Sequence, residues 1–538
     1  MRTELNSPFN VADFTRDLRL SFAGPALAAA VGLAGAGVLV YLATEVSVKL
    51  IAAVVGAAIC VSGAFICGNP RLYCLWGLMF TIPFDLSKRF GPIFLKLGGE
   101  SSFRLEVSDV FLLPLAIFLL RDIWTGRLKG LRIPKVTYVW FIIILMGVGW
   151  IIAGPWRMTA AHEVVRMLKV TILFLVVCNE LQRPNRILHC VTGITLGVTL
   201  QSVVALIQYF THAHLGLDLL GETGTVAIKN LESTSVQGEK VFRVGGFLSH
   251  PNLLGVFLAV LIPVAIAAFL LRLGRIHKLF FLGTAALGMA ALVATLSRSG
   301  WLSFAASFTL LMTLMILHRG LRRRSMLAAS VATLTLLVVS AIFAPQIMAR
   351  IFSSREAAML GRAEYLHDAW GMIKVKPILG WGLNSYVLAV GPFTKYHSNW
   401  AARKHYKDWI PPVHNIYFLW WAETGIIGLA IHLVLLACVA WPGIGNLRVK
   451  NETLFAVNAA CLSAMLAFWV DGFFSLSLRF NHILRVFWVL AAIMMAVRYL
   501  RLQESANAPT LGPTPQSDAL LAPNQYGGGP HWIRPVHP

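Results

Sequence analysis

Two arginines and one histidine in this sequence have side chains and surroundings suited to chemistry on a phosphate-containing substrate. Arg298 lies in LSRSGWL, Arg362 in GRAEYLHDAW and His414 in PPVHNIY, and each motif interrupts or borders an apolar stretch. A planar guanidinium donates paired hydrogen bonds to phosphate oxygens, so two arginines suit a diphosphate. A histidine that is neutral near pH 7 can accept a proton. These residue types would therefore suit a diphosphate and a proton acceptor.

Each of these side chains also has a purely structural interpretation. Arg298 could extend along the membrane boundary to lipid headgroups. Arg362 could pair in solvent with a nearby carboxylate such as Glu364, and His414, followed by Asn415, could cap or pack against the apolar helix that begins there. The residue types alone leave these alternatives open.

A further motif, FRVGGFLSHPNLLG, leads from a polar loop into an apolar helix. His250 and Asn252 stand near the helix start, where a polar side chain could simply be a cap. Arg243, just before them, is harder to explain by capping. We take Arg243, His250 and Asn252 as candidate substrate-binding residues, together with Asn415 and Trp370.

The composition requires membrane helices to hold these motifs. Of the 538 residues, 57% are hydrophobic and 13% charged, with a mean hydropathy of +0.70. These values exclude a soluble globular domain and predict an all-α polytopic integral membrane protein. The net charge of +22 belongs largely to short loops, so it does not indicate nucleic-acid binding. The seven cysteines lie in or beside apolar segments, which predicts neither a disulfide framework nor a zinc site.

About fourteen apolar runs approach the ~20 residues that a bilayer span needs. They lie at roughly 23–42, 50–66, 72–84, 107–124, 136–153, 164–178, 188–210, 253–273, 279–296, 301–317, 327–343, 416–440, 454–476 and 486–500. Two of them, 72–84 and 164–178, are short, and Lys169 lies inside the second. The sequence therefore predicts about 12–14 transmembrane helices, and the short turn at Arg298 predicts that the two helices flanking it are antiparallel neighbours.

Basic residues concentrate in alternate short loops, and the positive-inside rule places these loops and both termini in the cytoplasm. The predicted division is a cytoplasmic N-terminus (1–22), N-terminal transmembrane helices (23–344), a large periplasmic loop (345–412), C-terminal transmembrane helices (413–504) and a disordered cytoplasmic tail (505–538).

The large loop is expected to carry short amphipathic helices. The spacing of Arg362, Tyr365 and Trp370 is typical of a segment that rests on the membrane surface. A basic and aromatic run at 395–409 could attract an anionic substrate, or could be an ordinary solvated face.

The order and spacing of these motifs resemble a known family. FLSHPN, LSRSGWL, GRxxxxxxAW, PILGWG and VHNxYxxxxAETGIIG together look like the O-antigen ligase family, which includes O-antigen ligases and related O-antigen and exopolysaccharide polymerases. RLEVSDVFLLPL, early in the chain, is also similar to a segment of that family. The resemblance covers roughly residues 106–500, and the chain departs from it in the long 212–248 loop and the tail.

The resemblance implies a function on the periplasmic face of the cell inner membrane. Arg298, Arg362 and His414 match the family's essential residues: the arginines would hold the diphosphate of an undecaprenyl-linked glycan, and the histidine would activate an acceptor hydroxyl. The acceptor would be a glycan or a lipid-A core. The reaction would need no metal or cofactor, and other polysaccharide assembly proteins are possible partners. The motifs leave ligase and polymerase open.

A polysaccharide or lipid-linked oligosaccharide transporter or flippase is the alternative from another class. Transporters usually show repeated halves and broken helices that meet at the membrane midplane. Here the charged motifs collect at one surface, and the intramembrane candidates Lys169, Glu423 and Asp471 form no evident repeat.

Overall fold

The computed structural model describes Gly63 and residues 67–506, apart from 85, 95–98, 129, 218–219, 221, 223–232, 237–238, 249, 346–347, 349–354 and 395–410. Several predicted segments therefore lie outside the described residues. These are the N-terminus (1–22), the apolar run 23–42, nearly all of 50–66, the basic and aromatic run 395–409, and the tail from 507 onward.

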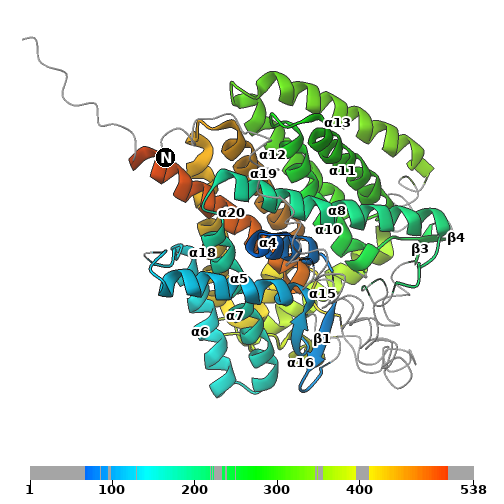
Figure 1. Cartoon of the computed structure of the whole chain (residues 1–538). Coiled ribbons are helices and arrows are strands. Elements are labelled where there is room, and N and C mark those ends of the chain that lie inside the picture. The colour runs from blue at the N-terminus through cyan, green and yellow to red at the C-terminus, as the bar shows by residue number, and fades with distance from the viewer. Residues whose placement is uncertain are drawn as a thin grey trace, which may run out of the picture.

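Every apolar run predicted between residues 72 and 500 forms a helix (Figure 1). The helices are α4 (Pro70–Thr81), α5 (Val107–Trp124), α6 (Val136–Ala153), α7 (Arg157–Glu180), α8 (Pro184–Thr211), α10 (Pro251–Phe269), α11 (Arg275–Ala294), α12 (Arg298–Leu317), α13 (Arg322–Ile342), α18 (Ile416–Gly445), α19 (Glu452–Gly472) and α20 (Asn481–Ala506). Among the described residues, nine helices, all of these except α4, α5 and α7, are long and apolar enough to cross a membrane. The predicted all-α polytopic fold is confirmed.

Several helix starts are specified by the local sequence. The side chains of Asn69, Ser297 and Asn451 accept hydrogen bonds from backbone N–H groups in the first turns of α4, α12 and α19. These bonds satisfy donors that have no partner within the helix. Pro251 occupies the first turn of α10, where its missing N–H costs nothing.

Helix α10 lies at the centre of the packing because it is apolar on every side. It packs against α11, α12 and α19, and α12 also packs against α19. Helices α11 and α12 contact each other, as the short turn between them predicts, but each packs more extensively against α10. In contrast, α13 lies at the edge of the bundle and exposes Leu334 and Leu337 (Figure 1).

The polar loops contain elements that the apolar pattern does not reveal. The large loop carries α15 (Arg355–Val375), which is longer than the short helices predicted there, followed by α16 (Tyr386–Ala389) and the 3₁₀ turn η3 (Gly391–Phe393). Two antiparallel hairpins pair β1 (Ser87–Phe90) with β2 (Phe103–Glu106), and β3 (Ser233–Val236) with β4 (Glu239–Phe242). The remaining short turns are η2 (Gly246–Leu248), η4 (Asn446–Arg448) and η5 (Ser477–Arg479).

Candidate active site

The predicted site residues come from helix ends that lie together at one end of the bundle. The starts of α10, α12 and α18 and the last turn of α19 meet there, because α10, α12 and α19 pack against one another and α18 packs against α19. Helix α15 of the large loop packs against α18 and adds Arg362.

Two glycines allow the starts of α10 and α12 to touch. A Cβ atom added to Gly300 would lie 3.0 Å from backbone atoms of Gly255, and one added to Gly255 would lie 2.8 Å from the Cβ of Ser297. Side chains at these positions would push the two helices apart. The glycines of FLSHPNLLG and LSRSGWL thus explain how the two motifs come together.

Arg243, His250 and Asn252 form one connected unit. Arg243 is buried; its Nε donates to the carbonyl oxygen of Thr295 (3.1 Å) and its Nη2 to Oδ1 of Asn252 (2.8 Å). The backbone N–H of Asn252 donates to Nδ1 of His250 (3.1 Å), which caps α10. Burial, assisted by the positive charges of Arg243 and His414, lowers the pKa of His250 to about 3, so the ring is neutral at pH 7.

Arg362 lies within electrostatic reach of both Arg298 and His414. Desolvation and the positive charge of Arg298 lower the pKa of Arg362, although its side chain still reaches solvent. Burial and the charge of Arg362 lower the pKa of His414 to about 4. The structure therefore brings together the three side chains predicted to be catalytic, with Arg362 between the neutral imidazole of His414 and the guanidinium of Arg298 in this chain of interactions.

Asp471 is a member of this cluster that the sequence analysis considered only as an intramembrane charge. Its side chain is 2% exposed, and the nearby hydroxyl groups of Ser299, Ser475 and Ser477 stabilise its ionised form. Its carboxylate also interacts electrostatically with Arg362. An aspartate in the last turn of an otherwise apolar helix was the sequence signal that could have placed it here.

The two remaining candidates, Asn415 and Trp370, have contacts away from this centre. Asn415 Oδ1 accepts from the N–H groups of Tyr417 and Phe418, and its Nδ2 donates to the carbonyl oxygen of Phe473 (3.2 Å), so it caps α18 and ties it to the end of α19. Trp370 is 41% exposed and packs edge-to-face against Trp421, with ring centroids 5.6 Å apart. Substrate contact by either residue stays a prediction.

The PILGWG motif, which follows α15, packs against the AETGIIG motif in α18, and this contact fixes the two helices relative to each other. Gly425 has a φ of +69° and interrupts α18, and a Cβ there would lie 1.9 Å from the carbonyl oxygen of Ile378. Ile426 N–H donates to the carbonyl of Pro377 (2.8 Å), and Gly382 N–H donates to the carbonyl of Glu423 (2.7 Å). The segment after α15 thus occupies the kink in α18, which requires glycine.

Within the described ranges, no three His, Cys, Asp or Glu side chains gather closely enough to hold a metal ion. The ionisable groups at the site are arginines, imidazoles and one carboxylate. This set can bind an anionic substrate and exchange a proton.

Residues 279–433 match the family model described as O-antigen ligase. We refer to this stretch as the O-antigen ligase domain. The family resemblance noted in the motifs is confirmed over this stretch, and it supports glycosyl transfer of the O-antigen ligase or polymerase type. No curated protein matches the chain.

The O-antigen ligase domain supplies Arg298, Arg362 and His414, the three side chains at the centre of the site. His250 and Asp471 lie before and after the matched stretch, yet both interact electrostatically with its residues. The site is therefore completed by helices on either side of the domain.

Proposed function

We propose that this protein transfers a glycan from an undecaprenyl diphosphate carrier to a hydroxyl group of an acceptor sugar on the periplasmic face of the inner membrane. The observation that supports this most is the meeting of Arg298, Arg362 and His414 from three separate motifs. An arginine pair suits a diphosphate, and a neutral imidazole beside it suits an acceptor hydroxyl.

The proposed step forms one bond and breaks one. The acceptor oxygen attacks the anomeric carbon of the donor while His414 takes the hydroxyl proton. The bond between that carbon and the diphosphate oxygen breaks, and the diphosphate leaves with the electron pair. Arg298 and Arg362 stabilise the negative charge that grows on the leaving group, so the step needs no metal ion.

Donor binding would strengthen the base. In the protein alone, a pKa of about 4 makes His414 a weak base, because burial and the charge of Arg362 disfavour its protonated form. A bound diphosphate offsets the arginine charge and thereby raises the pKa of His414. The base would then be strongest when the donor is in place, which favours transfer over unproductive proton uptake.

The distribution of basic residues supports the periplasmic orientation. At the end of the bundle opposite the site, Arg272 lies in the turn before α11 and Arg324 in the first turn of α13. Both pair with Glu452, and further arginines lie beside them. Basic loops favour the cytoplasmic side. The site, at the other end, would then face the periplasm, where the lipid-linked donor and surface glycans meet.

The acceptor distinguishes a ligase from a polymerase, and a deletion strain tests both. A lipid-A core without polymer would indicate a ligase, and a core with single repeat units an O-antigen polymerase. Loss of free exopolysaccharide alone would indicate an exopolysaccharide polymerase. Unchanged surface polysaccharide of every kind would contradict the proposed function.

A further inference from the structure

We propose that Arg479 is a positioning residue that fixes the position of His414 relative to Arg298 and Arg362. The inference rests on the proposed function, because it assigns His414 the role of base. Arg479 lies in η5, outside the O-antigen ligase domain, and touches none of the three central side chains in any described contact. It acts instead through the segments that carry them.

The guanidinium of Arg479 joins three separate parts of the chain. The side chain is 3% exposed; its Nη1 lies 3.2 Å from Oε2 of Glu423 and 3.6 Å from Oε1 of Glu163. Its Nη2 donates to Oδ1 of Asn384 (3.1 Å). The backbone carbonyl oxygen of Arg479 accepts from Arg166, which also pairs with Glu163. Two buried carboxylates thus face two buried arginines, and the charges balance.

Glu423 carries this constraint to the helix that begins next to His414. Its carboxylate accepts from the backbone N–H groups of Asn384 (3.0 Å) and Tyr386 (3.1 Å), so it clamps the turn after PILGWG onto α18. This clamp lies directly beside the kink at Gly425. The start of α18, and with it His414, is therefore fixed relative to the 384–386 turn.

The segment 381–386, which includes this turn, also contacts α15, the helix that carries Arg362. Tyr386 Oη donates to the carbonyl oxygen of Tyr365 (3.5 Å), and Trp381 Nε1 donates to that of Met372 (3.0 Å). Asn384 Nδ2 also donates to the carbonyl oxygens of Glu100 (2.7 Å) and Thr159 (3.0 Å).

The third link runs through η5 itself. The hydroxyl group of Ser477, two residues before Arg479, lies near Asp471 and stabilises its carboxylate, and Asp471 interacts electrostatically with Arg362. One buried guanidinium therefore connects the segments that carry the base, one arginine of the pair and the carboxylate beside it. A shift of about 1 Å between such groups can cost ~10²-fold in rate.

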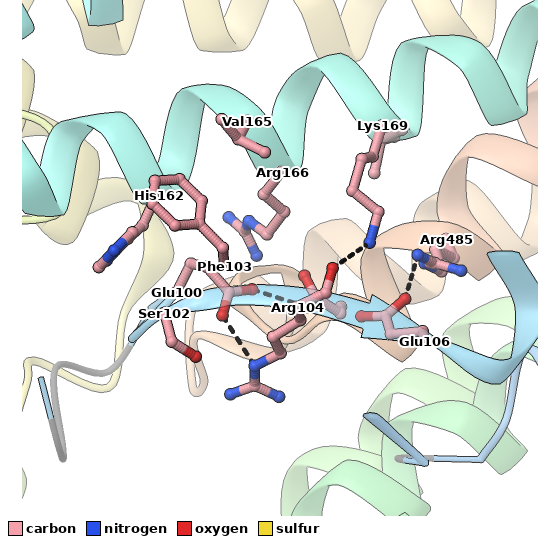
Figure 2. A pocket seen from close by; sticks show the side chains of 12 residues that line it. Glu100, Ser102, Phe103, Arg104, Glu106, His162, Val165, Arg166, Lys169 and Arg485 are labelled. Carbon is pink, nitrogen blue, oxygen red and sulfur yellow. Dashed lines mark hydrogen bonds and ion pairs between the residues drawn. The ribbon is translucent and has the colours of Figure 1, made fainter. Parts of the chain in front are cut away.

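Arg485 provides a matched control because it is an equally buried arginine six residues later. It pairs with Glu106 and Asp109 and donates to Ser108, all from the RLEVSD segment. Figure 2 shows Arg485 directed at Glu106, with Lys169 donating to the carbonyl oxygen of Arg104 nearby. None of these partners lies on an element that carries a central site residue. Loss of Arg485 should therefore disturb packing without moving His414.

The test compares Arg479→Lys with Arg485→Lys in purified protein, using donor isolated from cells that lack this protein. Arg479→Lys should lower kcat by about 10²-fold and leave the donor KM unchanged, since Arg298 and Arg362 remain. Arg485→Lys should lower the melting temperature by a similar amount but retain kcat. Asn384→Gly removes one Arg479 contact together with the bonds of Asn384 to Glu100 and Thr159, keeps every buried charge and suits the φ of +59° at that position. It should fold normally and lower kcat in the same direction.

Repeating the Arg479→Lys substitution in a His414→Ala protein distinguishes a positioning role from a general loss of folding. In His414→Ala protein, Arg479→Lys should have little further effect on the residual rate, because residues that act through one group are not additive. The inference would be overturned by any of three results. Arg479→Lys could lower the rate equally in the wild-type and His414→Ala proteins, or Arg479→Lys and Arg485→Lys could lower kcat equally. The third result is an unchanged kcat in the folded Asn384→Gly variant. Full activity of His414→Ala alone would instead remove the proposed function.

Discussion

The ring of Tyr365 stacks against the imidazole of His414, with centroids 5.7 Å apart and planes inclined by 22°. Tyr365 lies one turn after Arg362 on α15, so one helix supplies both a diphosphate-binding candidate and a surface that orients the proposed base. The stack restricts rotation of the imidazole. Tyr365 covers the face of the ring and not its edge, where the nitrogens lie.

Removal of this stack should slow transfer without weakening donor binding. Tyr365→Phe keeps the ring and should retain activity, whereas Tyr365→Ala should lower kcat by roughly 10-fold, the equivalent of an aromatic pair of about 1.4 kcal/mol. Initial transfer rates at saturating donor measure both variants. A loss in Tyr365→Phe as large as that in Tyr365→Ala would show that the hydroxyl matters and that stacking does not.

Lysine should replace the two arginines only in part. Arg298→Ala and Arg362→Ala should abolish transfer while the amount of membrane-inserted protein stays unchanged. Arg→Lys at either position should restore a fraction of the rate, because a point charge cannot donate the paired hydrogen bonds of a guanidinium. Full rates in the lysine variants would mean that these residues supply charge alone. Full rates in the alanine variants would place them outside the site.

Acid should inactivate the protein, and more readily once donor is bound. His414 is a base only when neutral, so activity is present above its pKa and is lost as the pH falls through that value. The lowered pKa of about 4 in the protein alone predicts that kcat/KM stays high down to mildly acidic pH. Because a bound diphosphate raises this pKa, the acid limb of kcat should lie at higher pH. Coincident limbs near the reference value of ~6.5 would contradict the proposed environment of His414.

The helices were predictable from the sequence because long apolar runs have few alternatives in a membrane. The bounds of α5 and α6 agree with the apolar pattern to the residue. The convergence of Arg298, Arg362 and His414 was foreseen only through the family resemblance, since spacing along the chain says nothing about which helix ends meet.

Tertiary contacts explain what the sequence did not reveal. The position of α10 between α11 and α12 depends on which faces pack, and an all-apolar helix has no distinctive face. Asp471 and Arg479 gain their surroundings from serines, carboxylates and backbone groups distant in sequence. PILGWG and AETGIIG could be recognised as motifs, yet their fit at Gly425 requires three-dimensional contact.

The orientation of the chain can be tested at two exposed lysine and arginine positions. We predict that Lys374, at the end of α15, lies outside the inner membrane and that Arg322, at the start of α13, lies inside. In cysteine-free protein, Lys374→Cys should react with an impermeant thiol reagent in intact spheroplasts, and Arg322→Cys should react only after lysis. The reverse pattern would place the site in the cytoplasm.

Photo-crosslinking of an undecaprenyl diphosphate analogue to purified variants tests the central claim most directly, because it separates binding from chemistry. His414→Ala should retain crosslinking at the wild-type level while transfer falls by about 10²–10⁴-fold, the usual loss when a general base is removed. Arg298→Ala should lose crosslinking itself. If His414→Ala abolishes crosslinking as completely as Arg298→Ala does, His414 is a donor ligand or a structural residue, and its assignment as the catalytic base is wrong.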